Sequence, residues 1–464
     1  MEPLKIWEIV KAVKGTLIQG SAETEVHDVV TDTRAIQPGM FFVPLKGERF
    51  DGHNFVKEAL AKGAVGFVTE QELSIVSGEV CIIKVKDTLE ALQDIAAYYR
   101  SKFPIPFIGI TGSVGKTTTK DMIAKVLEQR YCIHKTKGNF NNEIGLPLTV
   151  FGLRNEHQIG ITEMGMSGFG EISRLVYVAK PETAVITNIG LSHIEKLGSQ
   201  DNILKAKMEI FENLSDNGVA VLNGDDSNLF RLKGTLGFKV LYYGINNLEN
   251  DYRAVNIIHH DDNMTFDTTI DGKVYTITVP VMGEHNIYNS LAAIAVGLRY
   301  GMDIQEIAKG IAEFVPGNMR LNIFECKGIK VIEDCYNASP TSVEAALKVL
   351  KQLNSKRKIA ILGDMLELGE WTESSHRDIG RFTQENNADY LFAVGKYAER
   401  IKEGALNAGM PSERVYSFKD NNEINQTLES FLQQGDAVLV KGSRGMKMEN
   451  ISGYIRSAYL GEVK

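Results

Sequence analysis

Cysteine is scarce in this sequence, and the few cysteines form no metal or redox motif. Four occur among 464 residues: Cys81, Cys132, Cys326 and Cys335. None belongs to a C-x-x-C pair, and no histidine stands at zinc-finger spacing from them. The pattern excludes a zinc finger and is typical of buried or inert thiols in a reducing compartment.

Long apolar runs are also missing. No stretch approaches the roughly 20 apolar residues that span a bilayer. The N-terminal "MEPLKIWEIVKAVKG" is interrupted by Glu2, Glu8 and several lysines, so it predicts an amphipathic helix rather than a signal peptide. We therefore expect a cytoplasmic protein that does not insert into membranes.

An excess of positive charge is the third absence. The net charge of -8 argues against general binding of polyanions, so we expect no nucleic-acid partner, although a local phosphate site remains open. Internal repeats and low-complexity segments are lacking as well. At roughly 100 to 200 residues per domain, the length predicts about three globular domains.

Two proline-containing stretches mark the expected domain boundaries. "SKFPIPF" places Pro104 and Pro106 just before a strand-like run, and "EFVPGNMR" places Pro316 and Gly317 after a helical stretch. The predicted domains are therefore 1–102, 103–315 and 316–464.

The order of apolar runs predicts an α/β protein. In the middle segment, "FIGI", "IGITEMG", "TAVITNIG" and "GVAVLNGDD" alternate with helical stretches, as in a mainly parallel sheet of the P-loop ATPase type. The last segment repeats this pattern with "GIKVIEDCYNASP", "KIAILGDM", "YLFAVG" and "DAVLVKGS", which predicts a smaller Rossmann-like sheet. The first segment reads as a compact mixed α/β domain.

"GITGSVGKTTTKDM", residues 109–122, is a variant phosphate-binding loop. The usual G-x-x-x-x-G-K-[ST] would need glycine at position 110, which is isoleucine here. Glycines between a strand and a helix can still turn backbone N–H groups toward a phosphate at the helix N-terminus, and the Thr117 hydroxyl is placed for Mg²⁺. The predicted nucleotide-binding residues of the loop are Gly112, Ser113, Val114, Gly115, Lys116, Thr117 and Thr118.

The form T-G-x-x-G-K-T-T resembles the Mur ligase and folylpolyglutamate synthetase group of ATP-dependent amide-forming enzymes. Three further residues match motifs of that family. The resemblance implies that Glu163 binds Mg²⁺, that His193 coordinates metal, and that Lys207 is carbamylated by CO₂ and then binds a second Mg²⁺. It makes Lys116, Lys207 and His193 the expected catalytic residues.

The family resemblance also implies the rest of the ATP site. "GEHNIYNSLAA" places Asn286 and Asn289 where their amides could read the adenine edge, and leaves His285 structural. In the third segment, Arg320 would reach the phosphates and Asp334 the ribose, with Tyr336 and Asn337 beside them. The ATP site would then close only when the second and third domains approach, with "VPGNMR" as the hinge.

Five long motifs resemble those family members that add D-alanyl-D-alanine to a UDP-N-acetylmuramoyl tripeptide. They are "TKGNFNNEIGLPLT", "EMGMSGFGEI", "YNASPTSVEAAL", "ILGDMLELGE" and "LVKGSRGMKME". The resemblance implies three groups of substrate-binding residues. The UDP part would contact Thr33, Arg34, Lys46, Asp51 and Gly52; the muramoyl peptide would contact Asn139, Asn141, Asn142 and Glu143; the dipeptide carboxylate would contact Lys441, Ser443 and Arg444.

The implied reaction activates the tripeptide carboxylate as an acyl phosphate, with ATP and two Mg²⁺ ions, before the dipeptide amine attacks it. We expect a monomer acting on these small molecules in peptidoglycan synthesis. Two alternatives stay open: a relative that adds a diamino acid, whose Asp-Asn-Pro-Arg box is absent here, and a nucleotide-switched binding subunit with the same fold.

Overall fold

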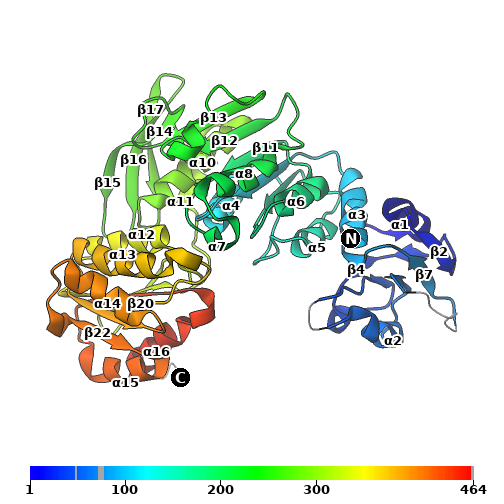
Figure 1. Cartoon of the computed structure of the whole chain (residues 1–464). Coiled ribbons are helices and arrows are strands. Elements are labelled where there is room, and N and C mark those ends of the chain that lie inside the picture. Colours follow the sequence, from blue (N-terminus) through cyan, green and yellow to red (C-terminus); the bar gives the residue numbers. More distant parts are fainter. Residues whose placement is uncertain (48–49, 72–77, 461–464) are drawn as a thin grey trace.

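The structure is a computed structural model of the chain, and it describes residues 1–47, 50–71 and 78–460. Figure 1 shows three regions, each built around its own sheet, with the middle region above and the other two on either side below it. The predicted fold class, a three-domain α/β protein, is confirmed. Glu48 and Arg49 of the predicted UDP segment, and the last four residues of the predicted third domain, lie outside the described residues.

The first region holds a five-stranded sheet in the order β2-β7-β6-β5-β4, in which β2 and β7 are antiparallel and the other pairs are parallel. A small antiparallel pair, β1 with β3, lies beside it. The strands are β1 (Leu4–Lys5), β2 (Thr16–Gln19), β3 (Glu25–Val26), β4 (Asp28–Val30), β5 (Met40–Phe42), β6 (Gly66–Thr69) and β7 (Cys81–Lys84). The helices are α1 (Ile6–Val13), η1 (Thr33–Ala35), η2 (Gly52–Phe55), α2 (Val56–Ala61) and α3 (Thr88–Ser101).

Helix α3 fastens the first region to the middle one. The Tyr99 hydroxyl donates to the Leu153 carbonyl at 2.8 Å, and the buried Arg100 guanidinium donates to the Ala179 carbonyl at 3.0 Å. One hydrophobic core runs without a break through residues of both regions. The predicted boundary at 102/103 falls between α3 and the next strand, in a short connection that is packed against both sides.

The middle region holds a seven-stranded, fully parallel sheet in the order β14-β13-β12-β11-β8-β10-β9. Its strands are β8 (Phe107–Thr111), β9 (Ile133–Lys135), β10 (Ile159–Glu163), β11 (Thr183–Ile186), β12 (Val219–Asn223), β13 (Lys239–Gly244) and β14 (Tyr252–Arg253). The helices are α4 (Lys116–Leu127), α5 (Gly145–Phe151), α6 (Glu171–Ala179), α7 (Ile194–Leu197), α8 (Gln200–Met208), η3 (Glu209–Phe211), α9 (Ser227–Phe230), α10 (His285–Arg299) and α11 (Ile304–Ala312).

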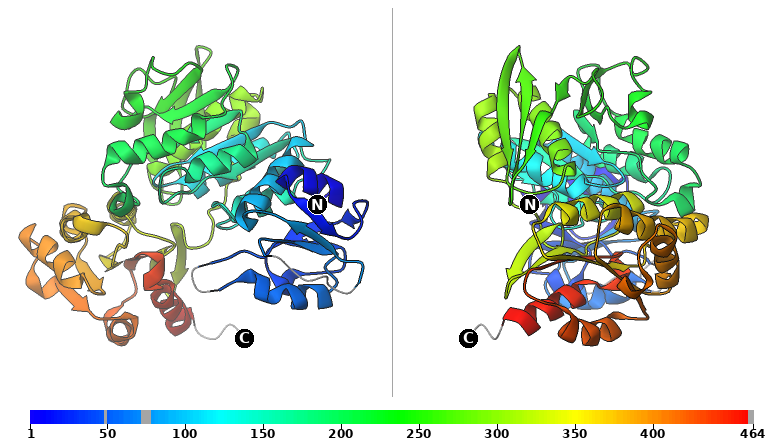
Figure 2. Two further views of the ribbon diagram at one scale, coloured as in Figure 1. Left: turned by 45° about the vertical axis from the view of Figure 1, so that its right-hand side comes forward. Right: turned by 90° about the vertical axis from the view of Figure 1, so that its left-hand side faces the viewer.

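Helices cover both faces of this sheet, as the side view in Figure 2 shows. Along β8, Phe107 packs into the core on one face, while Ile108 and Ile110 pack into the core on the other. Every residue of β8 is buried, which explains why this strand reads as a continuous apolar run rather than an alternating one. Because β8, β10 and β11 are parallel neighbours, their carboxyl ends lie at the same edge of the sheet, where the polar motifs follow the strands.

A separate antiparallel sheet of three strands follows, and it was not predicted. It comprises β15 (Val255–His259), β16 (Met264–Ile270) and β17 (Lys273–Val279). Asp271 and Gly272 connect β16 to β17 with positive φ angles of 49° and 75°, as a two-residue hairpin requires. The Asp-Gly pair between two alternating runs was the available sequence signal.

The third region holds a six-stranded sheet in the order β18-β19-β23-β20-β21-β22, antiparallel only at the β18–β19 edge. Its strands are β18 (Asn322–Cys326), β19 (Ile329–Asp334), β20 (Arg357–Gly363), β21 (Tyr390–Val394), β22 (Val415–Phe418) and β23 (Asp436–Lys441). Its helices are α12 (Pro340–Gln352), η4 (Gly369–Trp371), α13 (Thr372–Glu385), α14 (Ala398–Asn407), η5 (Ser412–Arg414), α15 (Asn421–Phe431), η6 (Arg444–Met446) and α16 (Glu449–Leu460).

Two hydrophobic cores lie on the two faces of this sheet. The predicted boundary at 315/316 falls in the connection between α11 and β18, and both domain limits stay predictions. Across the described parts of the chain, no helix combines the length and apolar character that crossing a membrane requires.

Candidate active site

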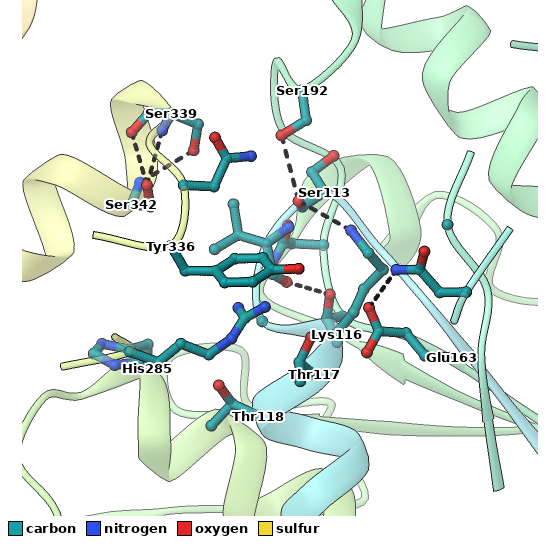
Figure 3. Close-up of a pocket in the computed structure, with 18 of the residues that line it drawn as sticks. Ser113, Lys116, Thr117, Thr118, Glu163, Ser192, His285, Tyr336, Ser339 and Ser342 are labelled. Carbon is teal, nitrogen blue, oxygen red and sulfur yellow. Dashed lines mark hydrogen bonds between the residues drawn. The ribbon is translucent and has the colours of Figure 1, made fainter. Parts of the chain in front are cut away.

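A cavity of about 840 Å³ lies where the middle and third regions face each other. Its floor is the loop after β8, and its other wall comes from residues around β19 and the start of α12. Figure 3 shows Tyr336, from the third region, pointing toward Lys116 of the loop, while Ser339 is bonded to Ser342 at the start of α12. Among the predicted site residues, those lining the cavity are Ser113, Val114, Gly115, Lys116, Thr117, Thr118, Asn141, Asn142, Glu143, Glu163, His193, Asn286, Asn289, Arg320, Asp334, Tyr336, Asn337 and Lys441.

The loop backbone is arranged for an anion, but not with every N–H group that the sequence suggested. The Ser113 N–H donates to the Asn188 carbonyl at 3.0 Å, and the Val114 N–H donates to the Asn188 side chain at 3.0 Å. The first N–H groups of α4, which begins at Lys116, have no partner within the helix. A phosphate would therefore meet the turn at Gly115 and the start of α4.

Gly112 is held in a space that admits no side chain. Its φ is +147°, and an added Cβ would lie 1.9 Å from the Thr187 hydroxyl oxygen. Thr187 in turn donates to the Val114 carbonyl at 2.6 Å. Thr187 and Asn188 thus support the loop from the end of β11, a role that the "TNIG" motif does not reveal by itself.

Lys116 lies over the loop with its ammonium turned back onto the backbone. The Nζ donates to the Gly112 carbonyl at 2.8 Å and to the Ser113 carbonyl at 3.5 Å. Burial lowers the pKa of Lys116, the Arg320 charge lowers it further, and Glu163 opposes both. The cation is desolvated inside the cavity, where its field acts strongly on an anion.

Glu163 has one carboxylate oxygen to spare. Oε1 accepts a hydrogen bond from the Asn141 amide at 2.8 Å. Oε2 is buried without a hydrogen-bond partner in the described structure, and the Lys120 ammonium stands 4.0 Å away. A buried carboxylate with one oxygen free of hydrogen bonds, at the end of a strand, is suited to bind a cation.

Lys207 is buried in α8, and in the described part of the chain no hydrogen bond or ion pair engages its ammonium. Burial lowers its pKa well below the ordinary value, and the Lys116 charge adds to this. His193 stands just before α7 with a φ of +64°, and its Nδ1 lies 2.8 Å from Oε2 of Glu367. Burial also lowers the pKa of His193, against the opposing charge of Glu367.

The described residues include no group of three or more histidine, cysteine, aspartate or glutamate side chains arranged to hold a metal ion. The predicted metal residues do not form a compact protein cage. Mg²⁺ seldom uses such a cage, because it keeps several waters and takes substrate phosphates together with one or two carboxylates.

The two asparagines of α10 are buried at the cavity wall, but their amides bind the protein. Asn286 donates to the Met282 carbonyl at 2.7 Å, and Asn289 donates to the Asn286 side chain at 3.0 Å. The Asn289 carbonyl accepts from Thr119 of α4 at 2.8 Å. Each amide retains one N–H for a ligand, and together they tie α10 to the phosphate-loop helix. His285 is partly buried and lines the cavity, and desolvation lowers its pKa to about 4.

Tyr288 also lines this wall and is held by Asp225, and neither residue was predicted. The Tyr288 hydroxyl donates to Asp225 at 2.8 Å, and the same carboxylate accepts the N–H groups of Ile245, Asn246 and Asn247. Tyr243, at the end of β13, lines the cavity beside Tyr288. Only the folded sheet brings these aromatic rings to the asparagines.

The third region contributes a cation and an ion pair. The Arg320 guanidinium lies 3.9 Å above the centre of the Tyr336 ring, and it faces the loop across the cavity. The Lys441 Nζ lies 2.5 Å from Oδ2 of Asp334 and donates to the Asn337 carbonyl at 3.0 Å. Asp334 and Lys441, expected to bind different substrates, are partners in one cavity.

Ser443 and Arg444 do not line that cavity. The Ser443 hydroxyl accepts the Leu366 N–H at 2.9 Å, and Arg444 is exposed and paired with Glu449 at 2.9 Å. His376 of α13 uses both ring nitrogens within the third region: Nε2 accepts the Met365 N–H, and Nδ1 donates to the Thr372 carbonyl.

The predicted UDP residues also stand apart from the cavity. Thr33 donates to Glu58 at 3.0 Å, and the exposed Arg34 pairs with Asp32 at 2.6 Å. Asp51 accepts the His53 N–H at 2.9 Å and bridges to Lys46 through the backbone. The Gly52 N–H donates to the Leu45 carbonyl, where an added Cβ would lie 2.6 Å from that oxygen.

Three residues of the asparagine-rich turn, Asn141, Asn142 and Glu143, line the cavity. Asn142 accepts the Ile144 and Gly145 N–H groups and so starts α5, while Glu143 forms an ion pair with Arg174. Asn139 is exposed and outside the cavity lining. Asn141 is the member of this set that reaches Glu163.

Comparisons with known proteins cover nearly the whole chain. Family models described as Mur ligase family, catalytic domain, as Mur ligase middle domain, and as Mur ligase, glutamate ligase domain match residues 25–100, 110–297 and 319–444. The UDP-N-acetylmuramoyl-tripeptide--D-alanyl-D-alanine ligase of Bacillus subtilis (strain 168) is 41% identical over 446 residues, covering 96% of each chain.

Two solved structures are similar throughout. The crystal structure of MurF from Acinetobacter baumannii superposes with a TM-score of 0.90 at 31% identity, covering 98% of both chains. The MurF ligase of Thermotoga maritima in complex with ADP has a TM-score of 0.83 at 28% identity, covering 92% of this chain and 96% of that one.

Proposed function

The chain belongs to the Mur ligase family, and we propose that it joins D-alanyl-D-alanine to a UDP-N-acetylmuramoyl tripeptide in an ATP-dependent reaction. The observation that carries the proposal is the cavity in which the phosphate loop and Lys116 face Arg320 and Tyr336 of the third region. The ligases that match this chain over nearly its full length bear the name of that reaction. The product would be the UDP-pentapeptide used in peptidoglycan synthesis.

In the first step, a carboxylate oxygen of the tripeptide attacks the γ-phosphorus of ATP. A new O–P bond forms, the bond to ADP breaks, and the carboxyl group becomes an acyl phosphate. The N–H groups at the start of α4 and the Lys116 ammonium would hold the negative charge that develops on the phosphate oxygens. Arg320 is placed to approach the same oxygens from the third region.

The residues of the cavity fit Mg²⁺. Thr117 and the spare oxygen of Glu163 would be ligands of one ion, beside ATP oxygens and water. His193 of the cavity lining and a carbamate on Lys207, which lies outside that lining, would be ligands of a second ion. When bound, the ions would neutralise charge on the transferred phosphoryl group.

Lys207 is suited to carbamylation because burial and the Lys116 charge both lower the pKa of its ammonium and so favour the neutral amine. Its nitrogen lone pair would attack CO₂, an N–C bond would form, and one proton would leave, giving an anionic carbamate. An anion there would also relieve the repulsion between two buried lysines, since Lys116 is the neighbouring charge that lowers the Lys207 pKa.

In the second step, the free amine of the dipeptide attacks the activated carbonyl carbon. The C–N bond forms through a tetrahedral intermediate, inorganic phosphate leaves, and the amine loses a proton. We assign the dipeptide carboxylate to the exposed Arg444, with Ser443 and Lys441 behind it, because a guanidinium can pair with a carboxylate in bidentate fashion.

The other two substrate groups keep their assignments as proposals. Thr33, Arg34, Lys46, Asp51 and Gly52 would hold the UDP part. The turn that contains Asn139, Asn141, Asn142 and Glu143 would hold the muramoyl peptide between the first region and the cavity. We place the reaction in the cytoplasm and expect a monomer.

The test measures phosphate release from ATP and Mg²⁺ with UDP-N-acetylmuramoyl tripeptide, with and without D-alanyl-D-alanine. We expect release that needs both substrates, a UDP-pentapeptide detected by mass, and a loss of about 10²-fold or more in Lys207→Ala. Lys205→Ala, on the exposed side of the same helix, is the matched control and should keep wild-type activity. Release that ignores the dipeptide would favour a diamino-acid-adding enzyme or a nucleotide-switched subunit.

A further inference from the structure

The segment from Asp364 to Trp371, here called the docking loop, is where the third region meets α7 of the middle region. Glu367 reaches from this loop to His193, with 2.8 Å between Oε2 and Nδ1. Two residues later, Gly369 lies so close to α7 that an added Cβ would stand 3.2 Å from the Glu195 Cα. In Figure 1, α7 lies at the border between the green and yellow regions, beside α12 and α13.

The docking loop is held firmly by its own region. The Met365 N–H donates to Nε2 of His376 at 3.0 Å, and the Leu366 N–H donates to the Ser443 hydroxyl at 2.9 Å. The Ser443 N–H donates a hydrogen bond to the Asp364 carbonyl at 3.0 Å. These three hydrogen bonds fix the backbone of the residues just before Glu367. The position of the Glu367 carboxylate is therefore well defined within the third region.

Both partners adopt an uncommon backbone conformation. The φ angles of His193 and Glu367 are +64° and +63°, in the left-handed region that side chains with a Cβ seldom occupy. The pair is also open to water, because 29% of the His193 side chain and 65% of the Glu367 side chain are exposed. A partly exposed contact between a histidine and a carboxylate adds little to stability, so stability alone does not explain why two strained residues meet here.

A carboxylate on one ring nitrogen of a histidine fixes the tautomer and orientation of the ring. Glu367 engages Nδ1, and Nε2 of His193 has no hydrogen bond in the described structure. His193 lines the cavity that also holds Lys116 and Glu163. The remaining ring nitrogen is therefore available on the cavity side of the ring.

We propose that Glu367 is a positioning residue that orients His193 only when the third region is docked on α7. The contact couples the arrangement of the two regions to completion of the reaction centre, so that His193 is held for chemistry in the docked state and released when the regions separate. The proposal rests on the proposed function for the role of His193, but the docking contact itself can be tested without turnover.

The first measurement is hydrogen–deuterium exchange of the ligand-free protein, read in peptides covering residues 190–198. Glu367→Ala should raise the exchange of this segment about threefold or more, because α7 loses its partner from the third region. Glu370→Gln is the matched control, since it removes a charge from the same exposed loop without touching His193, and it should exchange like the wild type. Unchanged exchange in Glu367→Ala would overturn the docking contact.

The second measurement is steady-state kinetics on the same variants. Glu367→Ala should lower kcat roughly 10- to 100-fold, raise the Mg²⁺ concentration for half-maximal rate, and leave KM for D-alanyl-D-alanine within about twofold. Glu367→Gln should recover part of the rate, because its amide oxygen can still accept the Nδ1 proton. A rate and Mg²⁺ dependence equal to wild type in Glu367→Ala would overturn the positioning role.

The two failures can be told apart. If the wild type and Glu370→Gln both fail to release phosphate with the two substrates, the proposed function fails, while the exchange data still decide whether Glu367 docks the third region. If both are active and only Glu367→Ala is slow, the inference stands with the function.

Discussion

Lys116 and Lys207 are both buried, and burial lowers the pKa of each ammonium. The Lys116 charge adds to the lowering of the Lys207 pKa, so the neutral form of the Lys207 amine is favoured. Glu163 adds a buried carboxylate oxygen without a partner in the described structure. At the residue scale, desolvation makes three ordinary side chains suitable for phosphoryl chemistry.

At this scale, His285 predicts that the free energy of unfolding depends on pH. Burial lowers its pKa from 6.5 to about 4, so between these values the unfolded chain binds a proton that the folded chain does not. Stability should therefore rise with pH through this window and level off above it. Between pH 5 and pH 7 this residue should therefore raise the free energy of unfolding by about 2 kcal/mol.

Urea unfolding of the wild type and His285→Gln at both pH values checks this. The variant should lose about 2 kcal/mol of the pH-dependent difference, whatever its absolute stability. His259→Gln, on an exposed strand, is the matched control and should retain the wild-type difference. Equal pH dependence in wild type and His285→Gln would contradict the assignment.

At the scale of elements, the phosphate loop depends on close contact between β8 and β11 through Gly112 and Thr187. The strand ends bring the loop, Asn188 and Glu163 to one edge of a parallel sheet, as the fold class requires. The docking loop plays the corresponding role in the third region, since its geometry is fixed by Ser443 and His376.

Gly112→Ala should therefore weaken nucleotide binding. The new methyl group would meet the Thr187 oxygen at 1.9 Å, so the loop must move away from its anion-binding form. We expect the dissociation constant for ADP with Mg²⁺, measured by calorimetry, to rise about tenfold or more.

Gly170→Ala is the control for this experiment. Its φ of +79° imposes a comparable backbone cost of about 1 to 2 kcal/mol, but nothing lies within 4 Å of the added Cβ. It should lose stability yet bind ADP as the wild type does. Tight ADP binding by Gly112→Ala would show that the loop tolerates a side chain there.

At the scale of the whole molecule, the two joints between regions differ in kind. The first and middle regions share one hydrophobic core, and Arg100 donates across it to the Ala179 carbonyl. The middle and third regions face each other across a cavity and meet through the exposed His193–Glu367 pair and through Met282, a single middle-region residue that packs into a core of the third region. We expect motion at the second joint and a rigid first joint.

Spin-label distances can measure this difference. Cys132 is exposed while the other three cysteines are buried, so one label site exists already on the middle region. The exposed positions of Glu413 and Lys57 supply the others, through Glu413→Cys on the third region and Lys57→Cys on the first. With ATP analogue, Mg²⁺ and tripeptide, the distance distribution between labels on the middle and third regions should shift or narrow. The distribution between labels on the middle and first regions should not change. The prediction would be contradicted if only the distances across the first joint changed, or if the distances across neither joint changed.

The sequence by itself determined the α/β class, the order of the strands that precede the motifs, and the residues of the phosphate loop, because strongly periodic apolar runs and glycine turns are local signals. It missed the β16–β17 hairpin and the support of the loop by Thr187 and Asn188. It also separated Asp334 from Lys441, which the folded chain joins at 2.5 Å. The tertiary structure alone decided these contacts, along with the His193–Glu367 meeting and the use of the Asn286 and Asn289 amides within the protein. Such pairings join residues from distant segments, and their geometry depends on how sheets and regions pack rather than on any nearby pattern of residues.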